Sequence, residues 1–99
     1  MYYVYILTNK NESTLYTGVT GRLIRRSYEH QEGFVPSFTK RYNIKKLLYY
    51  EVYTDIRDAL AREKQLKKWH RTWKIRAISK FNPSWRDLRE ELGVDLGDI

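Results

Sequence analysis

The stretch YTGVTGRLIRRSYEH, from Tyr16 to His30, decides how this chain folds. It predicts the end of a strand, a turn opened by glycine and then the first turns of a helix, which should run from about residue 22 to 31. Gly18 and Gly21 allow the backbone to leave the strand sharply. Arg26 and His30 stand four residues apart, so they share one side of that helix. A phenol, a guanidinium and an imidazole are thus gathered around one turn, which suits an anion. They fit equally well a sheet tyrosine beside two solvated side chains.

The residues before this stretch predict a β-hairpin. Residues 2–7 alternate as a strand does, residues 9–13 are polar turn material, and residues 14–19 form a second strand. In a symmetric register Tyr5 stands directly opposite Tyr16, with Cβ atoms roughly 5 Å apart. The pair would serve a site, or it would only stabilise the sheet.

The second half of the chain predicts one further strand and two further helices. Residues 44–53 are rich in Leu, Tyr and Val and form the strand. A helix begins at Asp55, capped by Thr54 or by Asp55 itself, and runs to about His70, and a short helix covers residues 73–81 with Phe81 pointing inward. The fold class is therefore α+β, a small three-stranded antiparallel sheet flanked by helices.

A single carboxylate interrupts the apolar stripe expected on the helix that begins at Asp55. Ile56, Ala59, Leu60 and Leu66 share one side of that helix, and helical spacing puts Glu63 close to the middle of them. A carboxylate that faces a core is costly unless it is paired or binds a metal. Glu63 is therefore a metal-ligand candidate, a buried partner of an Arg or Tyr, or evidence that the stripe is centred elsewhere.

Charge and composition point to a polyanionic partner. The chain of 99 residues makes one domain with a net charge of +7, and residues 1–82 hold 17 Lys and Arg against 7 Asp and Glu. Nucleic acid is the commonest such partner, and an anionic membrane surface or an acidic protein is the alternative. The chain has no cysteine and no apolar run long enough to span a membrane, so we expect a cytoplasmic protein without a membrane partner.

Two later segments carry weaker signals. Residues 34–43 interleave aromatic side chains with Lys40 and Arg41, which suits nucleic-acid contact, although the same cations can simply be solvated. Asn82 precedes Pro83, a pair that predicts the N-cap and first position of a terminal helix. Leu88 is expected to pack that helix back on the body.

Taken in order, these residues resemble the GIY-YIG nuclease superfamily, most closely its small stand-alone bacterial proteins. The resemblance covers roughly residues 2–85, so it predicts a nuclease domain over residues 1–85 and a short helix with a frayed tail over 86–99. Tyr3 replaces the glycine of the first half-motif, and Thr17 replaces the isoleucine of the second, and neither change removes a chemical group. The matching positions are Tyr3-Val4-Tyr5, Tyr16-Thr17-Gly18, Arg26, His30, Glu63 and Asn82.

The resemblance implies metal-dependent hydrolysis of DNA phosphodiester bonds, in DNA repair or recombination. Glu63 would hold Mg²⁺ or Mn²⁺, and no small-molecule cofactor is implied. RNA is not excluded as a substrate, and a monomer is expected, with a dimer or a protein partner as the route to targeting. The alternatives are a nucleic-acid-binding module that keeps the fold with little activity, and an interaction domain whose basic face meets an acidic protein. The implied catalytic residues are Tyr5, Tyr16, Arg26 and His30. The residues expected to contact nucleic acid are Gly18, Arg25, Lys40, Arg41 and Asn82.

Overall fold

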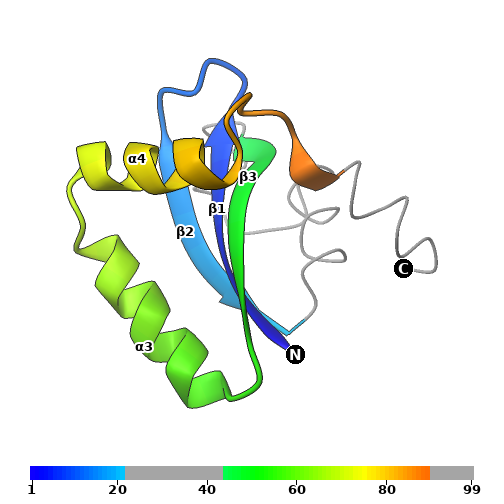
Figure 1. Cartoon of the computed structure of the whole chain (residues 1–99), viewed down its shortest axis with the longest axis vertical. Coiled ribbons are helices and arrows are strands. Elements are labelled where there is room, and N and C mark those ends of the chain that lie inside the picture. The colour runs from blue at the N-terminus through cyan, green and yellow to red at the C-terminus, as the bar shows by residue number, and fades with distance from the viewer. Residues whose placement is uncertain (22–43, 90–99) are drawn as a thin grey trace.

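A three-stranded antiparallel sheet with helices on one side forms the body of the protein (Figure 1). The computed structural model describes residues 1–21 and 44–89. The strands follow the order β2-β1-β3 in the sheet, and the expected α+β architecture is confirmed. The helix expected over residues 22–31 and the connection over 34–43 lie outside the described residues. The described elements are β1 (Tyr2–Asn9), β2 (Leu15–Thr20), β3 (Ile44–Tyr53), α3 (Ile56–Lys67) and α4 (Arg71–Phe81).

The two helices cover one side of the sheet, here called the helix face, where β1 presents Val4 and Ile6. Val4 packs against Ala59 and Leu66 of α3. Ile6 packs with Leu48 of β3 and with Ile78 of α4, as the inward position of Ile78 predicted. Because both helices lie over the same strand, β1 is buried where a two-layer protein needs its core.

The opposite side of the sheet, here called the tyrosine face, is rich in phenols. Tyr5 and Leu7 of β1 are buried there together with Leu47 of β3 and Leu88. Leu88 therefore packs on the body as predicted, although from the far side of the sheet. The expected division of the chain at residue 85 stays a prediction. Three further phenol side chains surround this cluster, those of Tyr3, Tyr16 and Tyr50.

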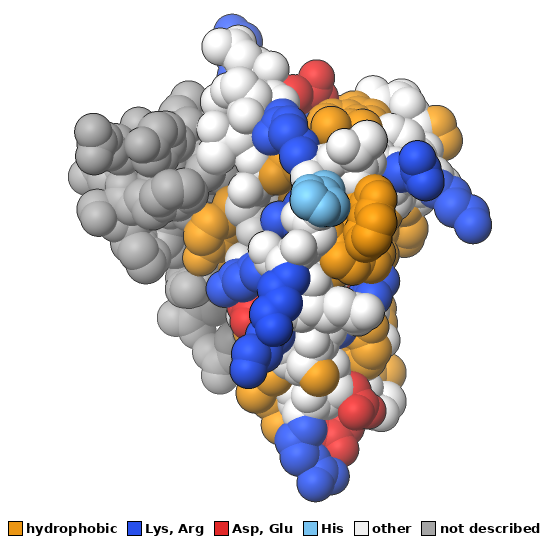
Figure 2. All heavy atoms as spheres, turned by 90° about the vertical axis from the view of Figure 1, so that its left-hand side faces the viewer, with side chains coloured by type: hydrophobic (Ala, Val, Ile, Leu, Met, Phe, Trp, Pro, Cys, Tyr) orange, Lys and Arg blue, Asp and Glu red, His pale blue; other side chains and the backbone are white. Residues whose placement is uncertain are grey.

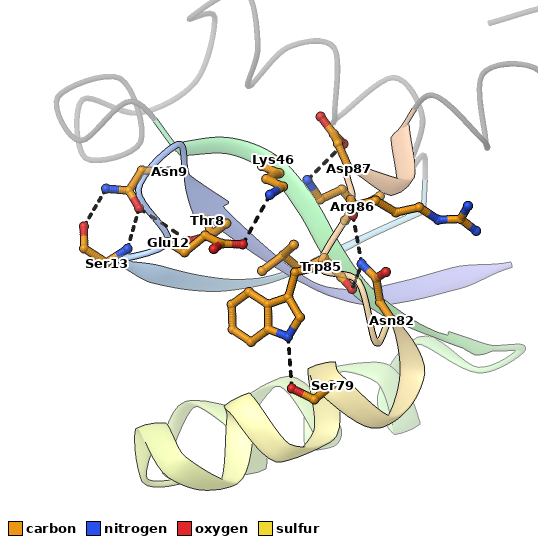
Figure 3. A network of polar contacts seen from close by, with 12 residues as sticks. Thr8, Asn9, Glu12, Ser13, Lys46, Ser79, Asn82, Trp85, Arg86 and Asp87 are labelled. Carbon is orange, nitrogen blue, oxygen red and sulfur yellow. Dashed lines mark hydrogen bonds and ion pairs between the residues drawn. The ribbon is translucent and has the colours of Figure 1, made fainter.

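The hairpin register differs from the symmetric one. Tyr5 pairs with Gly18 and Tyr16 pairs with Leu7, so the predicted direct opposition of Tyr5 and Tyr16 is wrong. The reason lies in Asn9, whose side-chain oxygen accepts the backbone N–H of Ser13 at 2.9 Å and that of Thr14 at 3.2 Å (Figure 3). This moves the centre of the turn one residue along the chain, and hence the pairing by two. The two phenols keep a common face and are diagonal neighbours.

Helix α3 is rotated from the expected orientation. Ala59 and Leu66 are fully buried, whereas Ile56 is 39% exposed and Leu60 is 47% exposed. The predicted stripe through Ile56 and Leu60 is therefore wrong, and Glu63 stands at the edge of the buried side of the helix. The cap at Asp55 is confirmed, since its carboxylate accepts the N–H of Arg57 at 2.8 Å. The helix ends at Lys67, earlier than expected.

The segment after α4 is bonded to the edge of β3. Asn82 ends α4 as its C-cap, so the predicted N-cap role is wrong. Its buried amide donates to the carbonyl oxygens of Leu48 at 3.2 Å and Arg86 at 2.8 Å, and Asp87 accepts the N–H of Leu47 (Figure 3). These bonds carry the chain around β3 from the helix face to Leu88. Phe81 was expected to point inward but is largely exposed, with its ring against the edges of Tyr49 and Tyr50.

We expect Thr17→Val to stabilise the protein. The buried Thr17 hydroxyl has no hydrogen-bond partner in the described part of the chain, so its replacement by a methyl group removes an uncompensated desolvation cost. The expected gain in the free energy of unfolding is about 1 kcal/mol, measured by chemical denaturation. Thr8→Val is the matched control and should destabilise the protein, because the buried Thr8 hydroxyl donates a hydrogen bond to the Thr14 carbonyl at 2.7 Å. A loss of stability in both variants would contradict this assignment.

Candidate active site

Tyr5 and Gly18 are packed against each other at the centre of the tyrosine face. Tyr5 is 2% exposed and pairs with Gly18 across the hairpin. A Cβ atom at position 18 would lie 2.5 Å from the Tyr5 hydroxyl oxygen and 2.6 Å from its Cζ. The Tyr5 ring therefore lies across the Cα atom of Gly18, and only glycine leaves room for it. This contact is the physical reason for a glycine two residues after Tyr16.

Tyr16 brings a second phenol to the same face. It lies on β2, which is an edge strand of the described sheet, and its side chain is half-buried. Tyr3 and Tyr50 complete the face, with ring centroids 6.3 Å apart in an edge-to-face arrangement. The structure thus gathers the two tyrosines expected at the site, although not as a directly opposed pair.

Glu63 comes from the other layer. Its side chain is 19% exposed, and the nearest recorded partner is Lys67, whose Nζ lies 3.5 Å from a carboxylate oxygen. Helix α3 packs on β1 and β2 from the helix face, so Glu63 and the tyrosine pair belong to opposite sides of the sheet. The described residues do not bring them together into one cluster.

Of the remaining residues expected at the site, the structure describes only Asn82. Arg26, His30, Arg25, Lys40 and Arg41 lie outside the described residues, so their roles stay predictions. Asn82 is buried, and its amide N–H groups donate to two backbone carbonyls, a geometry that positions the chain after α4.

The donor set is compatible with a hard divalent cation held by few protein ligands. Among residues 1–21 and 44–89 there is no group of three or more His, Asp or Glu side chains that could form a metal cage. Mg²⁺ commonly binds through one or two carboxylates, with water and phosphate oxygens completing its shell. Glu63, partly exposed at the rim of α3, fits that limited role.

A half-buried polar network around Glu51 was not foreseen from the sequence. Glu51 accepts hydrogen bonds from the hydroxyls of Tyr49 and Tyr53, which flank it on the helix face of β3. Arg62 of α3 donates to the same carboxylate from Nε at 2.9 Å and from a terminal nitrogen at 3.0 Å. The alternation of Tyr49, Glu51 and Tyr53 on one face of a strand was the available signal.

The network shifts the pKa of each of its members. Burial by itself raises the pKa of Glu51, but the bonds from Arg62, Tyr49 and Tyr53 outweigh it and hold that pKa below its usual value. Burial and the Glu51 carboxylate raise the pKa of Tyr53 to about 12, and the same causes raise the pKa of Tyr49. Glu51 is therefore ionised and both phenols are neutral across the physiological range.

The Glu51–Arg62 pair fixes the rotation of α3. The Arg62 guanidinium also donates to Gln65 at 2.8 Å, and its Cζ lies 4.9 Å from the centre of the Trp69 ring. Because Glu63 follows Arg62 on the helix, holding Arg62 on β3 turns Glu63 toward the rim of the layer. Arg62 and Glu63 are therefore both partly buried at the margin of the layer, Arg62 paired with Glu51 of β3 and Glu63 with Lys67 of its own helix.

Comparison with known families agrees with this arrangement. The family model described as the GIY-YIG catalytic domain matches residues 1–76. This match covers both strands of the hairpin, β3, α3 and the first half of α4. The chain belongs to the GIY-YIG domain family, which is a family of nucleases.

Its relatives are small proteins of matching length. A UPF0213 protein of Clostridium perfringens is 36% identical over 94 residues, which cover 95% of this chain and 100% of the relative. A UPF0213 protein of Syntrophus aciditrophicus is 39% identical over 82 residues, covering 82% of this chain and 92% of the relative. No solved structure matches. Within the described residues, no helix combines the length and apolar character needed to cross a membrane.

We expect Gly18→Ala to destabilise the protein by about 1–3 kcal/mol, because the added methyl group must displace the Tyr5 ring. Chemical denaturation measures the loss. Gly21→Ala is the matched control, since a Cβ there meets no atom closer than 3.7 Å. In a double-mutant cycle with Tyr5→Leu the cost at position 18 should shrink, and strict additivity would contradict the proposed clash.

The Glu51 network predicts the pH dependence of stability. Since the folded-state pKa of Glu51 is depressed, its contribution is present above the ordinary carboxyl range and is lost as pH falls through the folded-state pKa. Glu51→Gln should lower the free energy of unfolding at pH 7 by about 1–3 kcal/mol and flatten the acid limb of its pH profile. Lys64→Gln, an exposed change on α3, is the control.

The Glu51 network also predicts a loss of stability at alkaline pH. The pKa of Tyr53 is raised from 10.0 to about 12, so stability is present below pH 10 and is lost as pH rises through that interval. Tyr53→Phe should reduce this loss, as measured by urea unfolding across pH. If neither Glu51→Gln nor Tyr53→Phe changes the pH profile of the free energy of unfolding, the proposed network is contradicted.

Proposed function

We propose that the protein is a divalent-metal-dependent endonuclease that hydrolyses DNA phosphodiester bonds, in DNA repair or recombination. The observation that carries the proposal is the close packing of Tyr5 on Gly18, which holds one phenol rigidly beside a second one, Tyr16, on a common face. Membership of a nuclease family supports it. The excess of Lys and Arg over residues 1–82 supports a nucleic acid as the substrate.

In this proposal the two tyrosines have different tasks. Tyr5 is buried with its ring packed on Gly18, and its hydroxyl would orient the attacking water or a phosphate oxygen. Tyr16 is half-buried on an edge strand, where a backbone phosphate can reach it, and it takes or relays a proton from the water. A phenol needs a nearby cation to act as a base at neutral pH, and Arg26 remains the residue expected to supply it. His30 remains the residue expected to position Tyr16 or the phosphate.

Glu63 is the proposed ligand of Mg²⁺ or Mn²⁺. A bound divalent cation would supply electrostatic stabilisation of the leaving oxygen and of the charge that develops on phosphorus. Because Glu63 and the tyrosine pair belong to opposite sides of the sheet, we infer that the substrate passes the outer edge of β2. That strand carries Tyr16, and α3, which carries Glu63, packs against it.

A second function, nucleic-acid binding with little intrinsic hydrolysis, is favoured by one observation. Lys67 lies 3.5 Å from the Glu63 carboxylate and competes with a cation for it. A module that only binds would use the excess of Lys and Arg over residues 1–82 without needing Glu63.

We expect wild-type protein to cut supercoiled plasmid or branched DNA in the presence of Mg²⁺ or Mn²⁺. Tyr16→Phe and Glu63→Gln should each reduce the cleavage rate by roughly 10²-fold or more, because each removes a group used in the chemical step. Their affinity for uncleaved DNA in EDTA should be unchanged. Gel-based cleavage and fluorescence anisotropy measure the two quantities.

Each variant has a matched control. Tyr2→Phe removes a hydroxyl on the helix face of the same sheet, and Asp58→Asn removes an exposed carboxylate on the same helix. Both should cut at the wild-type rate. Binding without cleavage by wild type would favour the binding module, and equal cleavage by all variants would show that the assigned residues are wrong. The same panel made of RNA tests the other substrate.

A further inference from the structure

Positive charge gathers where α3 ends and α4 begins. Between Lys64 and Arg86 the chain has eight Lys and Arg residues and no Asp or Glu. Figure 2 shows Lys and Arg side chains over the face made by α3 and the start of α4. The members nearest the junction, here called the cationic surface, are Lys64, Lys67, Lys68, Arg71 and Lys74.

These cations are close enough to repel one another. Partial burial lowers the pKa of Lys74, and the charges of Lys67 and Arg71 lower it further. The first turn of α4 contains no acidic residue, so the positive end of its helix dipole adds to the same field. Carboxylates within α3 do not cancel this charge, since Glu63 meets only Lys67 among the recorded ion pairs of the described chain.

An exposed tryptophan stands in the middle of this charge. Trp73 is 51% exposed, an unusual value for so large an apolar side chain. Its ring is held edge-to-face by Trp69 at 6.0 Å and by His70 at 5.7 Å between centroids. Trp69 is in turn held by Arg62, whose carboxylate partner is on β3. These contacts restrict the motion of the Trp73 ring, so the ring loses less conformational entropy when a base stacks on it.

We infer that the cationic surface is a second nucleic-acid-binding site, in which Trp73 stacks on an unpaired base while the surrounding Lys and Arg side chains contact the flanking phosphates. The site lies on the helix face, opposite the tyrosine face, and at Lys67 it adjoins Glu63, the proposed metal ligand. It does not depend on hydrolysis. Its ligand class is a nucleic-acid strand with at least one unstacked base.

The combination of groups selects this ligand over other anions. An acidic protein or an anionic membrane would satisfy the lysines, whereas a nucleic-acid strand also presents a flat base beside each phosphate, within reach of both Trp73 and the cations. Stacking of a base on an aromatic side chain is worth about 1–3 kcal/mol and is independent of sequence. An aromatic ring held in place between cations can stack on a base while the cations bind the flanking phosphates.

The test compares two short strands that differ only in their bases. Fluorescence anisotropy in EDTA, where metal-dependent cleavage cannot proceed, measures the affinity for oligo-dT and for an abasic strand of equal length. Wild type should prefer oligo-dT. Trp73→Ala should weaken oligo-dT binding by roughly 5- to 100-fold and leave the abasic strand unchanged, so that the preference disappears. Trp73→Phe should restore most of it.

Two charge variants separate stacking from electrostatics. Lys68→Gln should weaken both strands equally and reduce the salt slope by about 0.7. Arg57→Gln, about 15 Å away along α3, is the matched control and should change nothing. Leu60→Ala controls for the loss of an exposed apolar side chain on α3, and circular dichroism verifies the fold of each variant.

The inference is overturned if wild type binds both strands alike, or if Trp73→Ala weakens both equally. Binding to anionic vesicles without binding to either strand would also overturn it. Because no outcome depends on cleavage, failure of this inference leaves the proposed nuclease reaction untouched, and the reverse also holds.

Discussion

The burial of five consecutive residues of β1, Val4 to Thr8, is the constraint on which the rest of the structure depends. A strand with both faces buried needs a cover on each side. On the helix face α3 and α4 supply it through Ala59, Leu66 and Ile78. On the tyrosine face Leu88 contributes, which is why the segment after α4 is bonded around the edge of β3. The elements on both sides of the sheet are thus packed on the central strand β1.

Two contacts then convert this core into a precise scaffold. Tyr5 occupies the space above Gly18, so the hairpin cannot slip without losing that fit. Glu51 holds Arg62 and so sets the rotation of α3 against the sheet. The first contact positions the phenols and the second positions Glu63. A half-buried ion pair adds little net stability, but this one favours one orientation of the helix where apolar packing alone would tolerate several.

The scaffold leaves two chemically different surfaces on opposite sides of the sheet. The tyrosine face carries hydroxyl groups suited to orienting water and phosphate. The cationic surface carries charge and a braced indole ring suited to holding a strand. Arg62 supports the second surface, because its guanidinium bonds α3 to Glu51 and also contacts the ring of Trp69. A basic protein of this size can in this way separate holding a polyanion from acting on it.

The sequence by itself determined the α+β class, the strand at residues 44–53, the cap at Asp55 and the common face of Tyr5 and Tyr16, because alternation, capping and glycine spacing are local properties. Only the tertiary structure decided the register, the rotation of α3 and the role of Asn82. The turn at Asn9 shifted the pairing by two residues, and the partner of Arg62 lies eleven residues away on another element. A long-range pair of this kind cannot be recognised from the local sequence, since helical periodicity does not show which side of α3 will meet the carboxylate of Glu51.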